Sequence, residues 1–320
     1  MSERLPSLQQ SVAAPVLLSD GHAGNRRQAE ALARALGHAG APHVTLNANA
    51  LARLLAPRVF PGAGNALGQD FVQCLQQPPP LAIGCGRQAA LATRLLRARG
   101  SFAMQILHPR LHPRHWDAVI APRHDGLAGA NVIQMDGSLH GVDAVSLAAA
   151  RDDFAEISAL PGPRVALLLG GASKHWPMPT EALLAALNLL SQAVAAQQGA
   201  LLVTTSRRTP AAWQKLLPML RPALLWRDER DGRNPYPGLL AWADVIVCSA
   251  DSVNMLSEAA ATPAPLYVLG SEYLQGRPAR FLHHLQTQGR IRAFDGSLAA
   301  FAATPLRETA RVAAQLLAMM

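Results

Sequence analysis

Aromatic residues are scarce in this chain of 320 residues, at 5% of the sequence, and charged residues make up only 16%. Nucleic acid is commonly bound by basic segments interleaved with aromatic side chains, and the sequence contains no such segment. We therefore expect no nucleic-acid partner. The formal net charge of +8 nevertheless favours an anionic partner, either a phosphorylated compound or an acidic membrane surface.

Cysteine is equally scarce, with only Cys74, Cys85 and Cys248, which are widely spaced and mostly lie in apolar runs. An odd number of unpaired cysteines predicts neither a disulfide framework nor a zinc site. The His-Glu-x-x-His motif of metalloproteases and the Gly-x-Ser-x-Gly motif of hydrolases are also missing. We therefore expect neither a metal nor a bound cofactor.

Long hydrophobic runs are absent too, and no stretch is long enough to span a bilayer. The segment from Met1 to Val12 is polar and lacks the apolar region of a signal peptide. These features predict a cytoplasmic protein, and peripheral contact with the inner face of a membrane remains open.

Half of the residues are hydrophobic, and the apolar runs alternate with helical patterns in two batches. This alternation predicts an α/β protein with two Rossmann-like domains that face each other across a cleft. The breaker Pro161-Gly162-Pro163 divides them into residues 1–160 and 161–320. We expect strands at 15–19, 43–46, 81–84, 102–107, 118–121, 131–134, 164–169, 200–205, 223–226 and 245–248, and helices that include 26–36, 142–159, 210–217, 254–261, 279–288 and 297–319.

Ligands of such sheets bind at the carboxyl ends of strands, so the loops there are the candidate sites. After the first strand, the loop from Asp20 to Asn25 has two glycines around His22. A neutral His22 can accept a proton from a hydroxyl, and Asp20 can orient it. The alternative is that Asp20 or Asn25 caps the following helix.

A second loop, Gly84-Cys85-Gly86-Arg87-Gln88-Ala89-Ala90, superficially matches the dinucleotide-binding pattern. The next strand ends at Leu107-His108, without the acidic residue that binds a nicotinamide ribose. This loop therefore favours a tight turn between strand and helix over a nicotinamide site.

A third loop has the sequence Gly170-Gly171-Ala172-Ser173-Lys174-His175-Trp176. Gly170 and Gly171 allow a diphosphate to approach the main chain, Ser173 can donate a hydrogen bond, and Lys174 can neutralise a leaving phosphate. The spacing is not that of a P-loop. A turn with a solvated Lys174 and a packed Trp176 is the alternative.

Paired arginines, Arg207 and Arg208, follow the next strand and can clamp a phosphate, or they can belong to a polar linker in which Thr209 caps a helix. Asn234-Pro235-Tyr236 borders a base-binding pocket or is only a loop. The segment 244–269 has the sequence of a strand, a polar loop with Ser249, Asp251 and Ser252, a helix start and a second strand. A helix start of this kind attracts anions, and Glu258 inside the helix can bind the vicinal hydroxyls of a sugar.

At these residues the chain resembles the family named after the plant mitochondrial-fission protein ELM1. The resemblance runs in order through nearly the whole chain. It rests on residues 18–25, 170–176, 204–209 and 249–259.

This resemblance implies a GT-B glycosyltransferase architecture, in which the N-terminal domain contacts an acceptor and the C-terminal domain holds a nucleotide-sugar donor. It implies that Glu258 binds the donor ribose and that the loop from Asp20 to Asn25 faces the reacting carbon. Lys174, Arg207 and Arg208 would stabilise the leaving diphosphate without a metal.

The leading hypothesis is a transferase that uses a nucleotide-sugar donor and an anionic or lipid-linked glycan acceptor of the cell envelope. A nucleotide-sugar epimerase on the same fold is an alternative. A scaffold or membrane-associated interaction protein without turnover is another.

Overall fold

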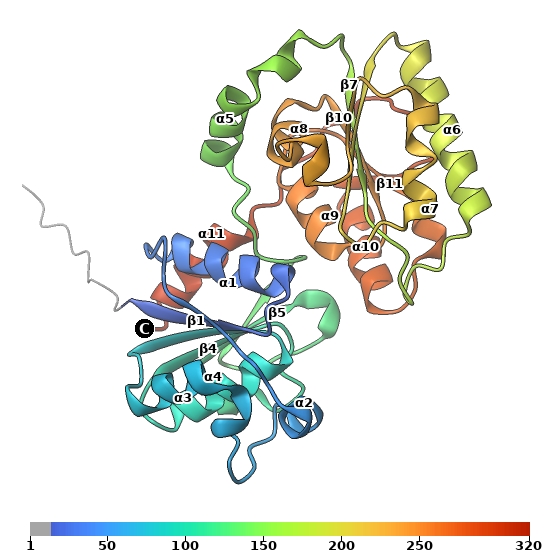
Figure 1. Ribbon diagram of the computed structural model, residues 1–320. Coiled ribbons are helices and arrows are strands. Elements are labelled where there is room, and N and C mark those ends of the chain that lie inside the picture. The colour runs from blue at the N-terminus through green and yellow to red at the C-terminus, as the bar shows by residue number, and fades with distance from the viewer. Residues whose placement is uncertain (1–13) are drawn as a thin grey trace, which may run out of the picture. The chain divides into compact units, whose positions relative to one another are not determined.

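The computed structural model describes residues 14–320 of the chain (Figure 1). The segment Met1–Val12, on which the expectation about a signal peptide rests, lies outside them. The chain forms two compact units, and neither is one continuous stretch of sequence. The first unit holds residues up to Ala121, residues 127–134 and residues 309–320, and the second holds residues 122–126 and 135–308.

The first unit is built on a six-stranded parallel sheet, as the alternating sequence pattern predicts. Its strands are β1 (Pro15–Ser19), β2 (His43–Thr45), β3 (Leu81–Cys85), β4 (Phe102–Ile106), β5 (Ala118–Pro122) and β6 (Val132–Met135). Its helices are α1 (Ala23–Ala35), α2 (Ala50–Leu55), α3 (Gln69–Gln76), α4 (Arg87–Arg97) and α11 (Glu308–Leu317).

The strands of this sheet lie in the order β2-β1-β3-β4-β5-β6. The chain moves from β1 to one side and from β3 to the other, so the strand order reverses between β1 and β3. Helices α1 and α11 cover one face of the sheet, and α3 and α4 cover the other (Figure 1). The loops after β1 and β3 therefore meet at the switch point, where doubly wound sheets bind ligands.

The second unit has its own six-stranded parallel sheet. Its strands are β7 (Arg164–Leu169), β8 (Ala200–Thr205), β9 (Leu224–Trp226), β10 (Val245–Ser249), β11 (Leu266–Leu269) and β12 (Ile291–Ala293). Its helices are α5 (Ala144–Asp153), α6 (Thr180–Ala196), α7 (Ala211–Gln214), α8 (Tyr236–Trp242), α9 (Val253–Ala260) and α10 (Arg277–Thr287).

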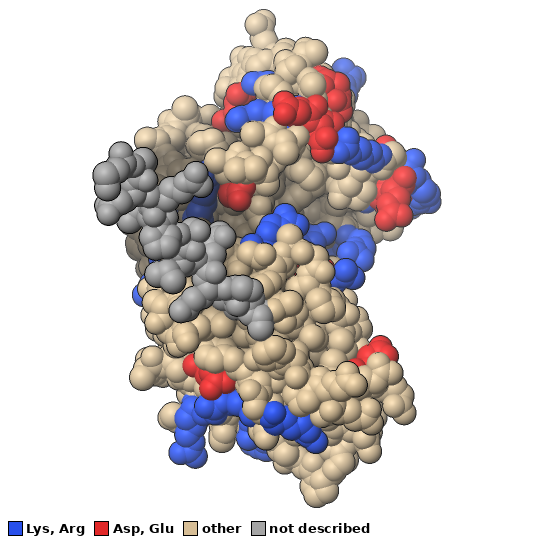
Figure 2. Space-filling model, turned by 90° about the vertical axis from the view of Figure 1, so that its left-hand side faces the viewer, with Lys and Arg blue, Asp and Glu red and all other residues tan. Residues whose placement is uncertain are grey.

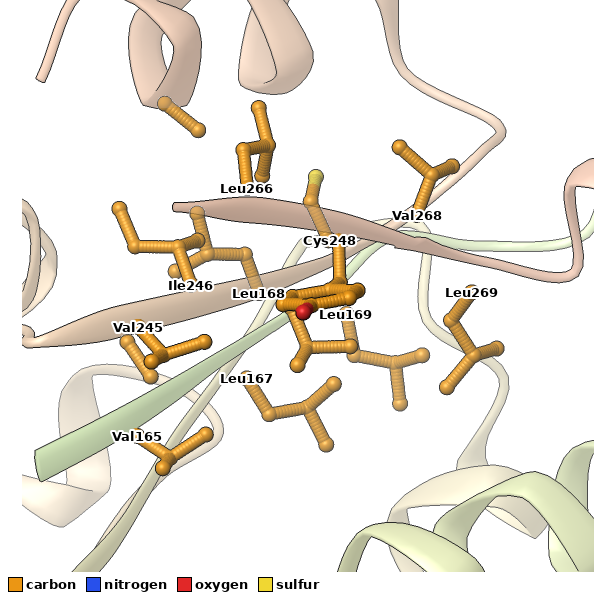
Figure 3. Close-up of a cluster of buried hydrophobic side chains, with 14 of the residues drawn as sticks. Val165, Leu167, Leu168, Leu169, Val245, Ile246, Cys248, Leu266, Val268 and Leu269 are labelled. Atoms are coloured by element: carbon orange, nitrogen blue, oxygen red, sulfur yellow. The ribbon is translucent and has the colours of Figure 1, made fainter. Parts of the chain in front are cut away.

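These strands lie in the order β12-β11-β10-β7-β8-β9, which is the full order of a Rossmann sheet. The switch point lies between β7 and β10, which pair in parallel. Helices α6 and α7 cover one face, and α8 and α9 cover the other (Figure 1). Because both faces are covered, the central strands are apolar along most of their length, and side chains of β7, β10 and β11 pack into one hydrophobic core (Figure 3).

The boundary between the units differs from the predicted break at residue 161. Helix α5 packs against α8, and the Ser138 N–H donates to Ser257 Oγ at 3.1 Å, so the chain joins the second unit from Met135 onward. The sequence predicts the break at Pro161 because prolines interrupt helices. In the structure Pro161 does follow the end of a short helix, Ala155–Ala159, but that helix already belongs to the second unit.

The end of the chain also differs from its prediction. The expected helix over 297–319 is reduced to α11, and Pro305, which has no N–H to donate, precedes its first turn. Val312 and Leu316 of α11 are buried in the first unit, and Arg311 Nη2 donates to the Gln134 carbonyl oxygen at 2.6 Å. No helix within residues 14–320 combines the length and apolar character needed to cross a bilayer.

His140 makes the stability of the second unit dependent on pH. The side chain is buried, and burial lowers its pKa from 6.5 to about 4. Its Nδ1 accepts a hydrogen bond from the Val142 N–H at 3.3 Å. Because the unfolded chain binds this proton more tightly than the folded one, the contribution is complete above pH 6.5 and is lost as the pH falls towards 4. We expect the free energy of unfolding to fall by about 2 kcal/mol between pH 7 and pH 5 from this group.

Urea unfolding of the native chain and of the variant His140→Gln at both pH values measures this effect. The variant should lose about 2 kcal/mol less than the native chain over the same interval. If the free energy of unfolding falls equally in the two proteins, His140 is not the cause of the pH dependence.

Candidate functional site

The loops after β7 and β10 lie side by side at the switch point of the second sheet, because the two strands are neighbours although some 80 residues separate them in sequence. The first loop begins at Gly170, and the second contains Asp251 and Ser252 and directly follows Ser249, the last residue of β10. The structure therefore brings most of the predicted donor-binding residues together at one edge of the second unit.

Ser249 and Asp251 hold the glycine pair of the neighbouring loop. Ser249 Oγ accepts from the Gly170 N–H at 2.7 Å and donates to Asp251 Oδ1 at 2.7 Å. Asp251 Oδ2 accepts from the Gly171 N–H at 3.0 Å, and the side chain of Asp251 is 0% exposed. Both glycine N–H groups thus have partners inside the protein.

The same contacts explain why glycines occupy these two positions. A Cβ at Gly170 would lie 2.1 Å from Asp251 Oδ1, and a Cβ at Gly171 would lie 2.2 Å from the Arg208 carbonyl oxygen. Glycine is therefore required for the approach of Asp251 and of the Arg208 backbone, a use that the sequence did not predict.

The paired arginines differ in their surroundings. Arg208 Nη2 donates to Asp251 Oδ2 at 2.7 Å, so this guanidinium is tied to the loop network. Arg207 and Lys174 are exposed, and within residues 14–320 their side chains form neither a hydrogen bond nor an ion pair. The two cations are thus available to an anion, whereas Arg208 is already shared.

Ser173 and Trp176 close the turn that carries Lys174. The Trp176 N–H donates to the Ser173 carbonyl oxygen at 3.0 Å, and the Trp176 indole donates to the Gly270 carbonyl oxygen at 2.7 Å. Trp176 is fully buried. It therefore anchors the loop, as the alternative interpretation of this segment expected, and the half-buried Ser173 stands beside Lys174 on its surface.

Helix α9 begins at the same edge, where Ser252 Oγ accepts from the Met255 N–H at 3.4 Å. Glu258 lies farther along the helix and is half-buried. Its Oε2 accepts from the Tyr236 hydroxyl at 2.5 Å. The carboxylate is thereby fixed in place in the second half of α9.

The sequence leaves two interpretations open for Tyr236, the border of a base-binding pocket or a residue of an ordinary loop. Asn234-Pro235 is typical of a loop, and Asn234 Oδ1 does accept from the Tyr236 N–H at 3.0 Å. Tyr236, however, is the first residue of α8. Two features of the sequence could have predicted this helix: Pro235, which is common at the beginning of helices, and the apolar residues that follow it.

The predicted His22 and Asp20 lie together after β1 in the first unit. Asp20 Oδ1 is 3.1 Å from His22 Nδ1 and accepts from the His22 N–H at 3.2 Å and from the Asn25 amide at 2.9 Å. The side chain of His22 is 79% exposed and that of Asp20 is 16% exposed. The carboxylate is held by the loop, while the imidazole projects from it.

The loop after β3 packs against this one at the switch point of the first sheet. A Cβ at Gly86, where φ is +94°, would lie 2.6 Å from Asn25 Nδ2. A Cβ at Gly84 would lie 2.6 Å from Thr93 Cγ2. These glycines serve close packing of strand and helix, in agreement with the tight turn expected there. Burial raises the pKa of Cys85 well above its ordinary value, so this thiol is neutral.

In the part of the chain that the structure describes, no group of three or more His, Cys, Asp and Glu side chains is arranged to hold a metal ion.

A family model described as mitochondrial fission ELM1 matches residues 23–320. The chain belongs to this family. It is 31% identical to the mitochondrial fission protein ELM1 of Arabidopsis thaliana over 278 residues, which cover 74% of this chain and 63% of the plant protein. The chain thus spans less than two thirds of the length of that relative. An uncharacterized protein of Rickettsia prowazekii is 26% identical over 342 residues, covering 93% of this chain and 96% of that protein.

Solved structures confirm the predicted fold. A putative UDP-N-acetylglucosamine 2-epimerase from Listeria monocytogenes has a TM-score of 0.58 at 11% identity and covers 96% of this chain and 88% of its own. The UDP-GlcNAc 2-epimerase of Methanocaldococcus jannaschii, solved with UDP-GlcNAc and UDP, has a TM-score of 0.52 at 11% identity, with coverage of 95% and 99%. MurG of Acinetobacter baumannii has a TM-score of 0.50 at 15% identity, with coverage of 94% and 90%. These neighbours are GT-B glycosyltransferases and epimerases, and the family resemblance and the GT-B-like fold predicted from the sequence are both confirmed.

Proposed function

We propose that this protein is a glycosyltransferase that moves a sugar from a nucleoside-diphosphate donor to a cell-envelope glycan or lipid-linked acceptor. The observation that carries the proposal is the Glu258 carboxylate, which the Tyr236 hydroxyl fixes on α9, the helix that follows β10 at the switch point of a full Rossmann sheet. A carboxylate in this position suits the two hydroxyls of a ribose. Two neighbours of the same fold were solved with UDP.

In this proposal the donor site belongs to the second unit. Glu258 binds the ribose, and the start of α9 at Ser252, together with Lys174 and Arg207, binds the diphosphate. The remaining predicted residues, Gly170, Gly171, Ser173, Arg208, Ser249 and Asp251, fix the loop that presents these groups.

The acceptor chemistry is assigned to His22 and Asp20. With Nδ1 directed at Asp20, the imidazole can take a proton from an acceptor hydroxyl through Nε2 as the hydroxyl attacks the sugar carbon. The leaving diphosphate carries the negative charge, which the cations and the helix start stabilise, so the reaction proposed here uses no metal. We place this activity in the cytoplasm, at the inner face of the membrane when the acceptor is lipid-linked.

Calorimetric titration with UDP, GDP, ADP and CMP, each with and without EDTA, tests the donor site. We expect one diphosphate to bind with an affinity that EDTA does not change. If none of the four binds, the donor site is wrong and the interaction-protein alternative takes its place.

The variant Glu258→Gln should weaken binding of that diphosphate by about 1–3 kcal/mol, because it replaces a charged acceptor with a neutral amide. Glu181→Gln, at an exposed site in the first turn of α6, is the matched control and should leave the affinity unchanged. Unchanged binding in Glu258→Gln would refute the assignment of the ribose to this carboxylate.

A nucleotide-sugar epimerase is the second candidate function, favoured by the TM-score of 0.58 to a putative UDP-N-acetylglucosamine 2-epimerase. An epimerase would convert its nucleotide-sugar into a stereoisomer with no acceptor present. Incubation of the bound donor without acceptor, followed by chromatography of the nucleotide-sugar, distinguishes the two activities.

A further inference from the structure

Large hydrophobic side chains are exposed on and just after helix α2 in the first unit. Leu51 is 49% exposed, Leu54 is 73% exposed and Val59 is 51% exposed. A single exposed leucine is ordinary, but three large apolar side chains within nine residues form a patch that ordinary packing does not explain.

Arginines surround this patch without any acidic residue in the same segments. Residues 50–62 and 87–101 contain no Asp and no Glu, and their arginines are Arg53, Arg58, Arg87, Arg94, Arg97 and Arg99. Most of these side chains are exposed. Figure 2, which presents one face of the molecule, shows basic side chains on its lower part, with a small acidic group directly above them.

Hydrogen bonds fix the two segments to each other. The Arg87 guanidinium donates to the carbonyl oxygen of Arg53, and Arg94 Nη1 donates to the carbonyl oxygen of Pro57 at 2.6 Å. Arg87 and Arg94 are seven residues apart on α4 and therefore lie on the same side of that helix. We call Leu51, Arg53, Leu54, Arg58 and Val59, together with Arg94 and Arg97, the α2 surface.

A hollow of about 650 Å³ opens beside Val59 in this surface. Arg94 and Arg97 line it, and Ser101 and His115 are also part of its wall. The Ser101 hydroxyl is buried and has no hydrogen-bond partner within residues 14–320. Asp117, which also lines the hollow, is paired with Arg97 at 2.9 Å. The hollow therefore combines two arginines with an apolar wall that includes Val59, Leu95 and Phe102, and it is large enough to admit a phosphate-bearing headgroup.

Charge complementarity decides which occupant fits the α2 surface. In a symmetric pair of chains this surface would face its own copy, and arginines would meet arginines. Single-stranded nucleic acid is usually held by stacking side chains among the cations, and aromatic residues are rare in this chain. A duplex would pair its phosphates with the arginines but offer no apolar partner for Leu51, Leu54 and Val59. A bilayer with anionic lipids offers both an apolar interior for exposed leucines and phosphates for arginines.

We propose that the α2 surface docks the protein on a bilayer that contains anionic lipids. Leu54 and Val59 enter the interfacial layer, the arginines contact lipid phosphates, and the hollow beside Val59 receives one headgroup. This proposal goes beyond the sugar-transfer reaction and does not depend on it, because it requires neither a donor nor turnover.

Co-sedimentation of the full chain with vesicles tests the proposal. Vesicles of phosphatidylcholine mixed with phosphatidylglycerol should bind the protein, vesicles of phosphatidylcholine alone should bind it at least about tenfold more weakly, and added salt should release it. The double variants Leu54→Ser/Val59→Ser and Arg53→Glu/Arg58→Glu should each reduce binding by about tenfold or more.

Two control variants match these changes. Met219→Ser removes a 68% exposed hydrophobic side chain from the second unit, and Arg34→Glu reverses a charge on α1, on the opposite face of the first sheet. Both should bind as the native chain does.

Three results would overturn the proposal: no binding to either vesicle, equal binding to both, or equal losses in the test and control variants. Light scattering provides a further check. If the native chain is a dimer and Leu54→Ser/Val59→Ser is a monomer, the α2 surface binds a second copy of the chain and the proposal is wrong. Nucleotide titration and urea unfolding of the same variants should give native values, so a failure of membrane docking is distinguishable from a failure of the donor site or of folding.

Discussion

Replacing His22 with alanine should lower the rate of sugar transfer by about 10²–10⁴-fold and leave the affinity for the nucleotide unchanged. The imidazole is 79% exposed, so its removal should also leave the free energy of unfolding unchanged. Single-turnover kinetics and calorimetry of the same preparation measure the two effects. A loss of nucleotide affinity equal to the loss of rate would mean that His22 has only a structural role.

Asp20→Asn separates a positioning role from simple loop packing. The amide can keep hydrogen bonds to Asn25 and the His22 N–H, but it no longer offers the negative charge beside His22 Nδ1 at 3.1 Å. We expect a reduced rate and a changed pH–rate profile, with nucleotide affinity preserved. His283→Ala, at an exposed histidine of α10, is the matched control and should change neither rate nor profile.

Replacing Asp251 with alanine should lower the free energy of unfolding by about 3 kcal/mol, because it leaves the buried Ser249 hydroxyl and the Gly171 N–H without their acceptor. The loop that carries Lys174 would lose the contact of Asp251 with the Gly171 N–H and be held mainly by Trp176, so nucleotide binding should weaken as well. Urea unfolding measures the first effect, and calorimetry at a temperature where the variant is folded measures the second.

Asp244 provides the comparison within the same unit. It also pairs with an arginine, Arg164, at 3.0 Å, but its side chain is 42% exposed. Asp244→Ala should therefore cost only about 1 kcal/mol or less. Gly170→Ala tests the network from the other side, since the new Cβ would lie 2.1 Å from Asp251 Oδ1. A loss for Asp251→Ala no larger than that for Asp244→Ala would contradict the assigned role.

The sequence allowed the fold to be predicted because its strands are short, apolar and separated by polar loops with glycines. The same pattern places the loops after β1, β7, β8 and β10 at strand ends, where the structure has them. The order of the strands was not predicted, because nothing local specifies that β7 lies beside β10. The hydrogen bonds of Gly170 and Gly171 to Ser249 and Asp251 depend on that adjacency. For this reason the sequence predicts a diphosphate beside the glycine pair, where the structure has the Asp251 carboxylate.

Other differences have local causes. Tyr236 was assigned to a loop because Asn-Pro precedes it, although the same proline can end a turn and begin a helix. The predicted helix over 297–319 is too long because it runs through Pro305, whose missing N–H interrupts a helix. The helices α2 and α3 are too short to show a clear helical pattern of apolar residues. The sequence pattern therefore does not predict them, nor the α2 surface that depends on α2.

The division of the chain between its two units fixes the order in which they are completed during translation. Residues 135–308, which hold every strand of the second sheet, leave the ribosome before α11 does. The first sheet is made earlier, yet Val312 and Leu316, which are buried in its unit, are made only after the second unit. The second unit is therefore complete in sequence once residue 308 has been made, while the first still lacks a helix that its core contains, and a chain that stops before residue 309 would present the first unit unfinished to chaperones.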